Sequence, residues 1–586
     1  MTAHTSVHAR TAALAVAALA LSTLAATQPA PADRVLVNGA VLTVDEADRV
    51  AQAVAIAGGK IVAVGTTEDI LRWAGPGTER IDLAGRAVTP GLIDAHVHFH
   101  SGGTQRLFVL DVGHPQVTSI EDVAREVRAQ AAKLPAGAWI EGRGWDEGKL
   151  AERRLITARD LDRAAGDHPV YLTQTTGHYG VANSVALTLA GITRDTPDPP
   201  NGTIDRYPDG TPTGVLKESA QGLVRRHIPP RSQADFARGI RELARAFNAE
   251  GMTGAKDPGV SPLAWEAYKA VQASGDLTVR VFALWPGGST LEAAERLIAE
   301  RGEMTRRREA TADDRLVAGG VKLFMDGSGG ARTAWLHEDW SLNYTGVDAG
   351  NRGYPAADAE VIRAMIHRYH DAGLHVSTHA IGDRAIDWVV DTYQAALARR
   401  PAKGLRHGII HANIPTDHAL AVMAELQRTW DAGYPEPSAA FTWWLGDTYA
   451  GNFGQARALR LNPFATFKAR GIRWANGSDF SVTPFPARYG LWSAVTRETL
   501  LGVHGTHPFG RDEAVDVRTA LRAVTIWAAR QMFLEDKIGS IEVGKYADLA
   551  VWDRNPYEVP AAALKDMTCT MTMVGGQVVY RAAAPR

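Results

Sequence analysis

The sequence predicts an α/β protein: a (β/α)8 TIM barrel with a small β-sandwich domain formed from both chain ends and an inserted subdomain after strand 1. Eight short apolar runs recur through the central chain, and most are followed by a helical pattern. Strands that alternate with helices favour a parallel sheet, and eight such units favour a closed barrel. Two alternating apolar regions at opposite ends of the chain cannot cover their own apolar faces alone, so we expect them to pack together.

The N-terminus is typical of a secretory signal peptide over residues 1–32. Arg10 precedes an apolar run at 11–21, and a small-x-small site follows at 30–32. The run is short for a membrane span. The sequence therefore predicts an exported protein, periplasmic or secreted, with no membrane association after leader removal. A misassigned start codon or a retained anchor is the alternative.

The two terminal regions are predicted to form the β-sandwich, with residues 33–88 from the N-terminal end and residues 521–586 from the C-terminal end. The N-terminal region contains Gly58 and Gly59 between two alternating apolar runs, which is a hairpin signal. The barrel is predicted at 89–520.

The eight apolar runs give the expected barrel strands. They lie at 90–98, 251–257, 277–284, 320–326, 374–379, 407–411, 438–443 and 471–479. About 150 residues separate the first run from the second, which is far more than an ordinary connection. We interpret about 105–245 as the insert over the barrel mouth.

Composition limits the partners. The chain has 586 residues, a net charge of −2 and 22% charged residues. Nucleic acid or an anionic membrane would call for a basic face, so we expect a small-molecule substrate. A homo-oligomer stays open. The single cysteine, Cys569, excludes a disulfide within the chain.

Candidate metal ligands end several of the runs. His96 and His98 alternate on the first run, so both side chains point to one face. His379, His411 and Asp479 end the fifth, sixth and eighth runs, where strands of a barrel meet the catalytic face. Structural histidines would explain a lone pair, but convergence of all five predicts a site for Zn²⁺ or a related divalent ion.

Lys322 lies inside an apolar strand, where a lone ammonium would be unfavourable. Two interpretations stay open on spacing alone. In the first, the lysine is carboxylated and its carbamate would bridge two cations. In the second, its ammonium group reaches the solvent-filled mouth of the barrel or pairs with Asp326.

Several motifs together resemble amidohydrolase family 3, the YtcJ-like branch that includes N-substituted formamide deformylases. The resemblance covers essentially the whole mature chain. The motifs lie at 88–98, 144–147, 178–184, 213–218, 321–328, 379–385, 411–412 and 477–479.

This resemblance implies the barrel, the β-sandwich and a specific metal site. The implied ligands are His96, His98, Lys322, His379, His411 and Asp479. It implies one or two divalent ions, with Zn²⁺ favoured, bridged by carboxylated Lys322 if there are two. His178 is similar to a substrate-facing histidine of the family, with a structural role as the alternative. His100 is left outside the ligand set.

The functional hypothesis is a hydrolase that acts on carbon–nitrogen bonds other than peptide bonds. Metal-activated water would cleave an amide of the N-substituted amide or formamide type. Asp479 would take the water proton and deliver it to the leaving nitrogen, with His178 assisting the developing oxyanion. Hydrolysis of a cyclic amide or ester, or isomerisation of a carbonyl compound, would use the same site. A non-catalytic exported ligand-binding protein is the third alternative.

Overall fold

The structure is a computed structural model that describes residues 30–343, 348–505, 507 and 510–583. The predicted signal peptide falls almost wholly on residues 1–29, outside the described residues. Among the described residues, no helix has the length and apolar character needed to cross a bilayer.

A seven-stranded parallel sheet forms the centre of the molecule and gives it a TIM-barrel-like fold, in the order β8-β15-β16-β17-β18-β19-β20. Nearly all of its residues are buried, as expected for a parallel sheet covered by helices. The strands are β8 Leu92–Asp94, β15 Met252–Pro258, β16 Arg280–Pro286, β17 Leu316–Phe324, β18 Val376–Ala380, β19 Gly408–His411 and β20 Tyr434–Glu436.

The segment predicted as the eighth strand, 471–479, is not a regular strand, yet it bridges the two edges of this sheet. Backbone amides at 475 and 477 donate to β20 and the residue after it, and further bonds join the segment to the chain at and beyond β8. The four bonds are Ala475 N to Pro435 O (3.2 Å), Gly477 N to Pro437 O (3.1 Å), Ala95 N to Asn476 O (3.0 Å) and Asp479 N to His96 O (2.7 Å).

Proline explains why this closing segment is irregular. Pro435 and Pro437 have no N–H, so this edge offers the segment carbonyl acceptors and few donors. The prolines also explain an error in the sequence prediction. The apolar run at 438–443 predicts the seventh strand, but that strand is β20, and the residues of the run form helix α13 Ala440–Trp444.

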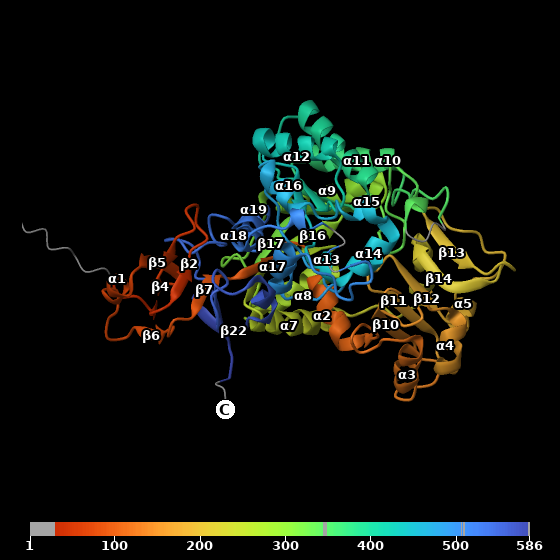
Figure 1. Ribbon diagram of the computed structural model, residues 1–586, viewed down its shortest axis with the longest axis horizontal. Helices are drawn as coiled ribbons and strands as arrows, with labels where there is room; N and C mark the ends of the chain where they lie inside the picture. Colours follow the sequence, from red (N-terminus) through yellow and green to blue (C-terminus); the bar gives the residue numbers. More distant parts are fainter. Residues whose placement is uncertain (1–29, 344–347, 506, 508–509, 584–586) are drawn as a thin grey trace, which may run out of the picture.

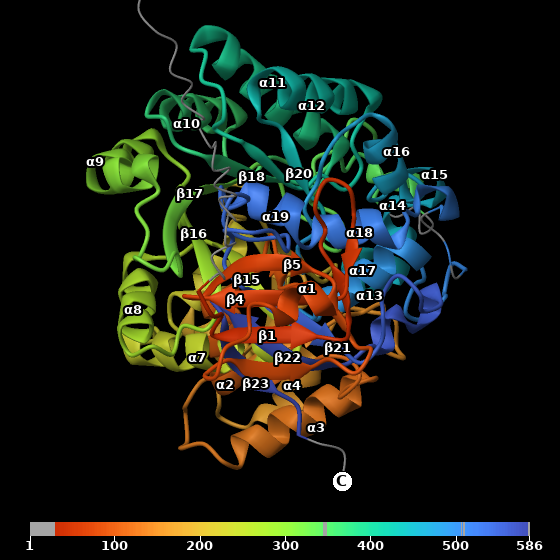
Figure 2. The same ribbon diagram turned by 90° about the vertical axis from the view of Figure 1, so that its left-hand side faces the viewer.

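Helices connect successive strands and cover the outside of the sheet (Figure 2). Those between the first seven strands are α2 Phe99–Phe108, α7 Gln233–Ala249, α8 Pro262–Ala273, α9 Leu291–Arg307, α10 Ala359–Asp371, α11 Asp383–Arg399 and α12 Asp417–Trp430. Those that follow α13 are α14 Gly446–Phe453, α15 Gln455–Ala458, α16 Phe464–Ala469, α17 Ala487–Thr496, α18 Val517–Ala523 and α19 Ile526–Gln531.

Two sheets at one end of the molecule combine both ends of the chain (Figure 1). One has the order β5-β4-β1-β6, and the other has the order β23-β22-β21-β7-β2-β3. Apolar residues of both sheets share one buried cluster. The strands are β1 Arg34–Val37, β2 Ala40–Leu42, β3 Val50–Ala51, β4 Ala53–Ala57, β5 Lys60–Gly65, β6 Glu79–Asp82, β7 Ala87–Pro90, β21 Leu549–Trp552, β22 Cys569–Val574 and β23 Gln577–Arg581. Helix α1 Thr67–Leu71 follows β5.

The residues between α2 and α7 carry a six-stranded sheet of their own, which lies across the central sheet from strands β1, β4, β5 and β6 (Figure 1). Its order is β13-β14-β12-β11-β10-β9. Its strands are β9 Leu110–Asp111, β10 Ile140–Trp145, β11 Val170–Gln174, β12 Tyr179–Ala182, β13 Gly202–Arg206 and β14 Pro212–Glu218. Its helices are α3 Ile120–Ala131, α4 Ala158–Ala165, α5 Ser184–Leu189 and α6 Gly222–Arg225.

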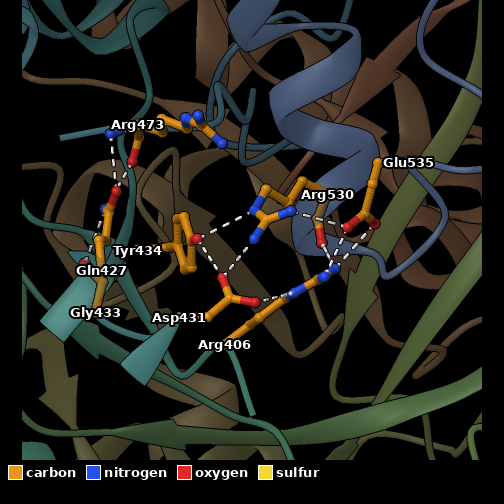
Figure 3. Close-up of polar contacts among 8 residues, drawn as sticks. All are labelled: Arg406, Gln427, Asp431, Gly433, Tyr434, Arg473, Arg530 and Glu535. Carbon is orange, nitrogen blue, oxygen red and sulfur yellow. Dashed lines mark hydrogen bonds and ion pairs between the residues drawn. The ribbon is translucent and has the colours of Figure 1, made fainter. Parts of the chain in front are cut away.

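A network of charged side chains links the N-terminal end of β20 to α19 and to Glu535, which follows it (Figure 3). Asp431 accepts hydrogen bonds from Arg406 (3.1 Å) and Arg530 (2.8 Å), and both arginines also pair with Glu535. Gln427 holds the start of the closing segment, because it exchanges two 2.9 Å hydrogen bonds with the backbone of Arg473. The barrel is therefore fastened at the end away from its mouth.

A buried ion pair joins the barrel to the sheets of the chain ends. Arg280 of β16 donates to Asp548 from Nε (2.6 Å) and from a terminal nitrogen (3.0 Å), and both side chains are 2% exposed. Asp548 also accepts from the backbone of Gly575 (2.7 Å).

Replacement Asp548→Ala is expected to lower the free energy of unfolding by about 3–5 kcal/mol, because it leaves the Arg280 guanidinium buried and unpaired. Urea denaturation followed by circular dichroism measures the change. The control Glu68→Ala removes an exposed i,i+4 pair with Arg72, and its effect should stay below about 1 kcal/mol. Equal effects of the two variants would contradict the assigned role.

Candidate metal centre

One cavity of about 550 Å³ is lined by all six predicted metal-site residues and by His178. The site residues stand at or near the C-terminal ends of the barrel strands, where the catalytic face of such a fold lies. His96 and His98 follow β8, Lys322 belongs to β17, His379 to β18 and His411 to β19, and Asp479 ends the closing segment.

The tightest cluster joins His96, His98 and Asp479. Asp479 Oδ1 lies 3.4 Å from His96 Nε2 and 3.2 Å from His98 Nε2. One ligand atom from each residue lies within 4.8 Å of the other two. A divalent cation bonded to nitrogen and oxygen at about 2.0–2.2 Å can bridge atoms at this spacing.

Several buried polar atoms in this cluster have no hydrogen-bond partner among the described residues. They are Nδ1 and Nε2 of His96, Nδ1 of His411 and Oδ1 of Asp479. Orphaned buried polar atoms are rare in folded proteins. A cation between imidazole nitrogen and carboxylate oxygen would satisfy Nε2 of His96 and Oδ1 of Asp479, so the residues present fit a divalent metal ion.

His96, His379 and His411 are held in the neutral form that binds metal. Burial, reinforced by the nearby charge of Lys322, lowers the pKa of His96 to about 3. Burial also holds the pKa of His379 and of His411 well below the usual range. Burial alone would raise the pKa of Asp479, but the adjacent imidazoles of His96 and His98 outweigh it, so the pKa of Asp479 is well below the usual range.

His379 and His411 complete the cluster, with ring centres 4.6 Å apart. The ring of His411 lies 5.4 Å from that of His96, and His411 Nε2 lies 3.9 Å from Asp479 Oδ2. His379 Nε2 lies 2.9 Å from the carbonyl oxygen of Gly327. If Nε2 donates to that carbonyl, Nδ1 is the nitrogen free to bind a cation.

Lys322 has its amine in the cavity and forms no ion pair with Asp326. Asp326 instead accepts backbone hydrogen bonds from Trp335, Ile381 and Gly382 at 2.8–3.0 Å. The Lys322 amine lies 4.3 Å from the ring centre of Phe324. Burial lowers its pKa to about 8, so a substantial fraction of the amine is neutral near that pH.

Two of the predicted ligands have left-handed backbone conformations. His411 has φ of 71° and Asp479 has φ of 55°, values that residues other than glycine seldom adopt. Such conformations cluster at functional sites, where the surrounding structure holds them in place. Gly477 lets the segment before Asp479 approach His96 closely, because a Cβ atom at position 477 would lie only 2.6 Å from His96 Cβ.

The insert supplies His178, and with it Glu218, which the sequence motifs alone did not single out. His178 Nδ1 lies 3.0 Å from Glu218 Oε2, and its ring centre lies 5.2 Å from that of His379. Glu218 also accepts from Thr333. Burial lowers the pKa of His178, but the charge and hydrogen bond of Glu218 outweigh it and the net shift is upward. Glu218 ends the motif at 213–218, and that position is the signal that could have found it.

A second missed residue, Asp94, ties the closing segment to the histidine pair. It accepts from Ser478 N (2.9 Å), Ser478 Oγ (2.6 Å) and His96 N (3.2 Å). It therefore fixes the backbone on both sides of the cluster.

Other residues near the site have structural partners. His100 is paired with Asp257 at 2.7 Å. The tryptophans Trp335, Trp443 and Trp444 pack against other aromatic rings and are not among the residues that line the cavity.

A TIM-barrel-like sheet with imidazole and carboxylate groups at the C-terminal ends of its strands is typical of metal-dependent barrel enzymes. The chain belongs to the amidohydrolase family, whose sequence model matches residues 79–580. This confirms the resemblance found in the sequence.

Two relatives match over almost the whole chain. The putative amidohydrolase YtcJ of Bacillus subtilis is 29% identical over 92% of this chain and 97% of its own length. The N-substituted formamide deformylase of Arthrobacter pascens is 29% identical over 94% of this chain and 98% of its own length. A solved structure, described as an uncharacterized metal-dependent hydrolase from Pyrococcus horikoshii, matches with a TM-score of 0.69 and 25% identity over 90% of this chain and 99% of that one.

Replacement of His98 or His411 by alanine is expected to weaken divalent-cation binding roughly tenfold or more, since even outer partners of metal ligands are worth about 10–100-fold. Mass spectrometry of metal content after dialysis at fixed Zn²⁺ measures the loss. His418→Ala is the control, because His418 is exposed and paired with Asp391. Wild-type metal content in either ligand variant would contradict the assignment.

Proposed function

We propose that the protein is a metal-dependent hydrolase that cleaves an amide C–N bond of the N-substituted amide or formamide type. The observation that carries the proposal is the set of buried, unpaired imidazole and carboxylate atoms at the mouth of the barrel. Membership of the amidohydrolase family and the deformylase activity named for the Arthrobacter pascens relative support it.

His96, His98, His379, His411 and Asp479 would hold the metal. A divalent cation supplies Lewis acidity and makes water nucleophilic near neutral pH. Asp479 keeps a carboxylate at that pH, because its pKa is low. Its Oδ1 faces His96 and His98, and its Oδ2 lies on the His411 side. We assign to Asp479 the acceptance of the proton from water and its delivery to the leaving nitrogen.

His178 is assigned to the carbonyl oxygen of the substrate. Glu218 occupies the Nδ1 side of its ring, so Nε2 is the nitrogen left for a ligand in the cavity. The raised pKa of His178 favours its protonated form. A cationic donor stabilises negative charge that develops on the oxygen during attack. Glu218 is the positioning residue of this pair.

We propose Zn²⁺ as the favoured ion, in one or two copies; if two ions bind, a carboxylated Lys322 would bridge them. Burial lowers the pKa of Lys322 to about 8, and a neutral amine adds carbon dioxide to form a carbamate and releases a proton. The Lys322 amine also forms no hydrogen bond to a described residue, so it is available for this reaction. Two ions per chain in the metal analysis would support the bridge, and one ion would oppose it.

Residues 1–32 support a further proposal, that the protein is exported. Periplasmic or secreted protein whose N-terminus begins near residue 33 would support it.

Replacement Asp479→Asn is expected to lower kcat on an N-substituted formamide by about 10²–10⁴-fold, because the proton acceptor is lost. The amide keeps the shape of the side chain, so metal content should stay largely intact. Steady-state rates and metal analysis on the same sample provide the measurement. Turnover at the wild-type rate would discredit the assignment, and a panel of amides, lactams and esters identifies the bond cleaved.

Replacement Glu218→Gln is expected to move the basic limb of the kcat/KM–pH profile to lower pH. The charge that raises the pKa of His178 is removed, and the lowering by burial is left. Glu242→Gln, on the outer helix α7, is the control and should leave the profile in place. A basic limb unchanged in Glu218→Gln would show that His178 does not act as the acid.

A further inference from the structure

Two arginines of the insert line the cavity that holds the candidate metal centre. Arg143 of β10 and Arg225 at the end of α6 line the cavity together with Ser101 and Gln105 of α2. These four residues are also among those that line a smaller hollow. Both arginines therefore belong to the boundary between the two hollows.

Arg143 is half-buried and forms no ion pair among the described residues. The negative charge of Asp479 acts on it through the cavity without direct contact. The one hydrogen bond of the Arg143 side chain among the described residues runs to the carbonyl of Thr175 at 2.9 Å, and its buried Nε has no partner. A Cβ atom on Gly177 would lie 3.5 Å from Arg143 Nη1. The guanidinium thus lies beside the backbone that leads to His178.

Arg225, which is exposed, adds a second positive charge on the same side of the cavity. In the described chain it has neither an ion pair nor a hydrogen bond from its side chain. The nearest acid of this wall, Glu141, is paired with Arg231 at 2.5 Å. Burial lowers the pKa of Arg143 to about 10, and the charge of Arg225 contributes to that shift. The two guanidinium groups line the same cavity without an ion pair and repel each other, so an anion bound beside both would relieve that repulsion.

The acids of the same cavity are already engaged. Glu218 is held by His178 and Thr333, and Asp326 by three backbone amides. Asp479 faces His96 and His98, with which it would hold the metal ion. None of these carboxylates forms an ion pair with Arg143 or Arg225. The side of the cavity formed by Arg143 and Arg225 therefore carries a net positive charge, even without a metal ion.

We propose that Arg143 and Arg225 bind a carboxylate of the substrate, so that the amide cleaved is an N-acylated amino acid. A guanidinium fork matches the two oxygens of a carboxylate, and a cavity of about 550 Å³ accommodates a small molecule that reaches both the arginines and the metal centre. The substrate class rests on the proposed amide hydrolysis, but the anion subsite does not.

Calorimetric titration of the metal-loaded protein tests the subsite without turnover. The probes are 4-phenylbutanoate and the neutral 4-phenylbutan-1-ol. In Arg143→Gln and in Arg225→Gln we expect binding of the acid to weaken about 10- to 100-fold and binding of the alcohol to stay unchanged. Arg226→Gln is the matched control, because Arg226 is exposed like Arg225 but does not line the cavity, and among the described residues its side chain bonds only Gly222 O.

Three results would overturn the proposal. Equal affinity of the wild type for the acid and the alcohol would show that no anion subsite exists. Unchanged affinity for the acid in both arginine variants would show that the carboxylate binds the metal alone. Tighter binding of phenyl phosphate than of 4-phenylbutanoate would replace the carboxylate with a phosphate ligand.

Kinetics then test the substrate class. N-formylphenylalanine should have a higher kcat/KM than N-formylphenethylamine, which lacks only the carboxylate, and Arg143→Gln should abolish the preference through KM. Equal rates on both would sink the substrate assignment and leave amide hydrolysis standing. If the protein hydrolyses neither formamide but still binds 4-phenylbutanoate through the arginines, amide hydrolysis is wrong and the anion subsite stands.

Discussion

The candidate site depends on how the barrel closes. The segment at 471–479 fits between β20 and the chain after β8, and it brings Asp479 within 3.4 Å of the His96 imidazole. Gly477 allows the close approach, and Asp94 ties Ser478 to the backbone of His96. Without this closure the histidine pair would face the cavity with no carboxylate beside it.

The same closure concentrates unsatisfied groups. Burial keeps the imidazoles of His96 and His411 neutral, and the orphaned atoms of His96, His411 and Asp479 lie in one cavity. Such a cluster lowers the stability of the fold, because each buried polar atom without a partner costs free energy. Packing alone therefore does not account for it. At the opposite end of the barrel, Asp431 accepts hydrogen bonds from Arg406 and Arg530. These contacts fix the N-terminal end of β20.

Sequence periodicity placed the strands that end in the predicted ligands well, because a polar residue at the end of an apolar run marks the C-terminal end of a buried strand. His379 and His411 were found in this way. It misplaced the seventh strand, since Pro435 and Pro437 look like loop residues until their carbonyls are seen to bond the closing segment. Glu218 and Arg143 lie in the insert, and only the fold shows that they reach the barrel mouth. The domain boundaries and the roles of the site residues stay predictions.

Anomalous diffraction from crystals of the metal-loaded protein at the zinc edge tests the central claim most directly. A peak within bonding distance of His96 Nε2, His98 Nε2 and Asp479 is the predicted result. An anomalous peak elsewhere in the chain, with these three side chains hydrogen-bonded to water alone, would contradict it.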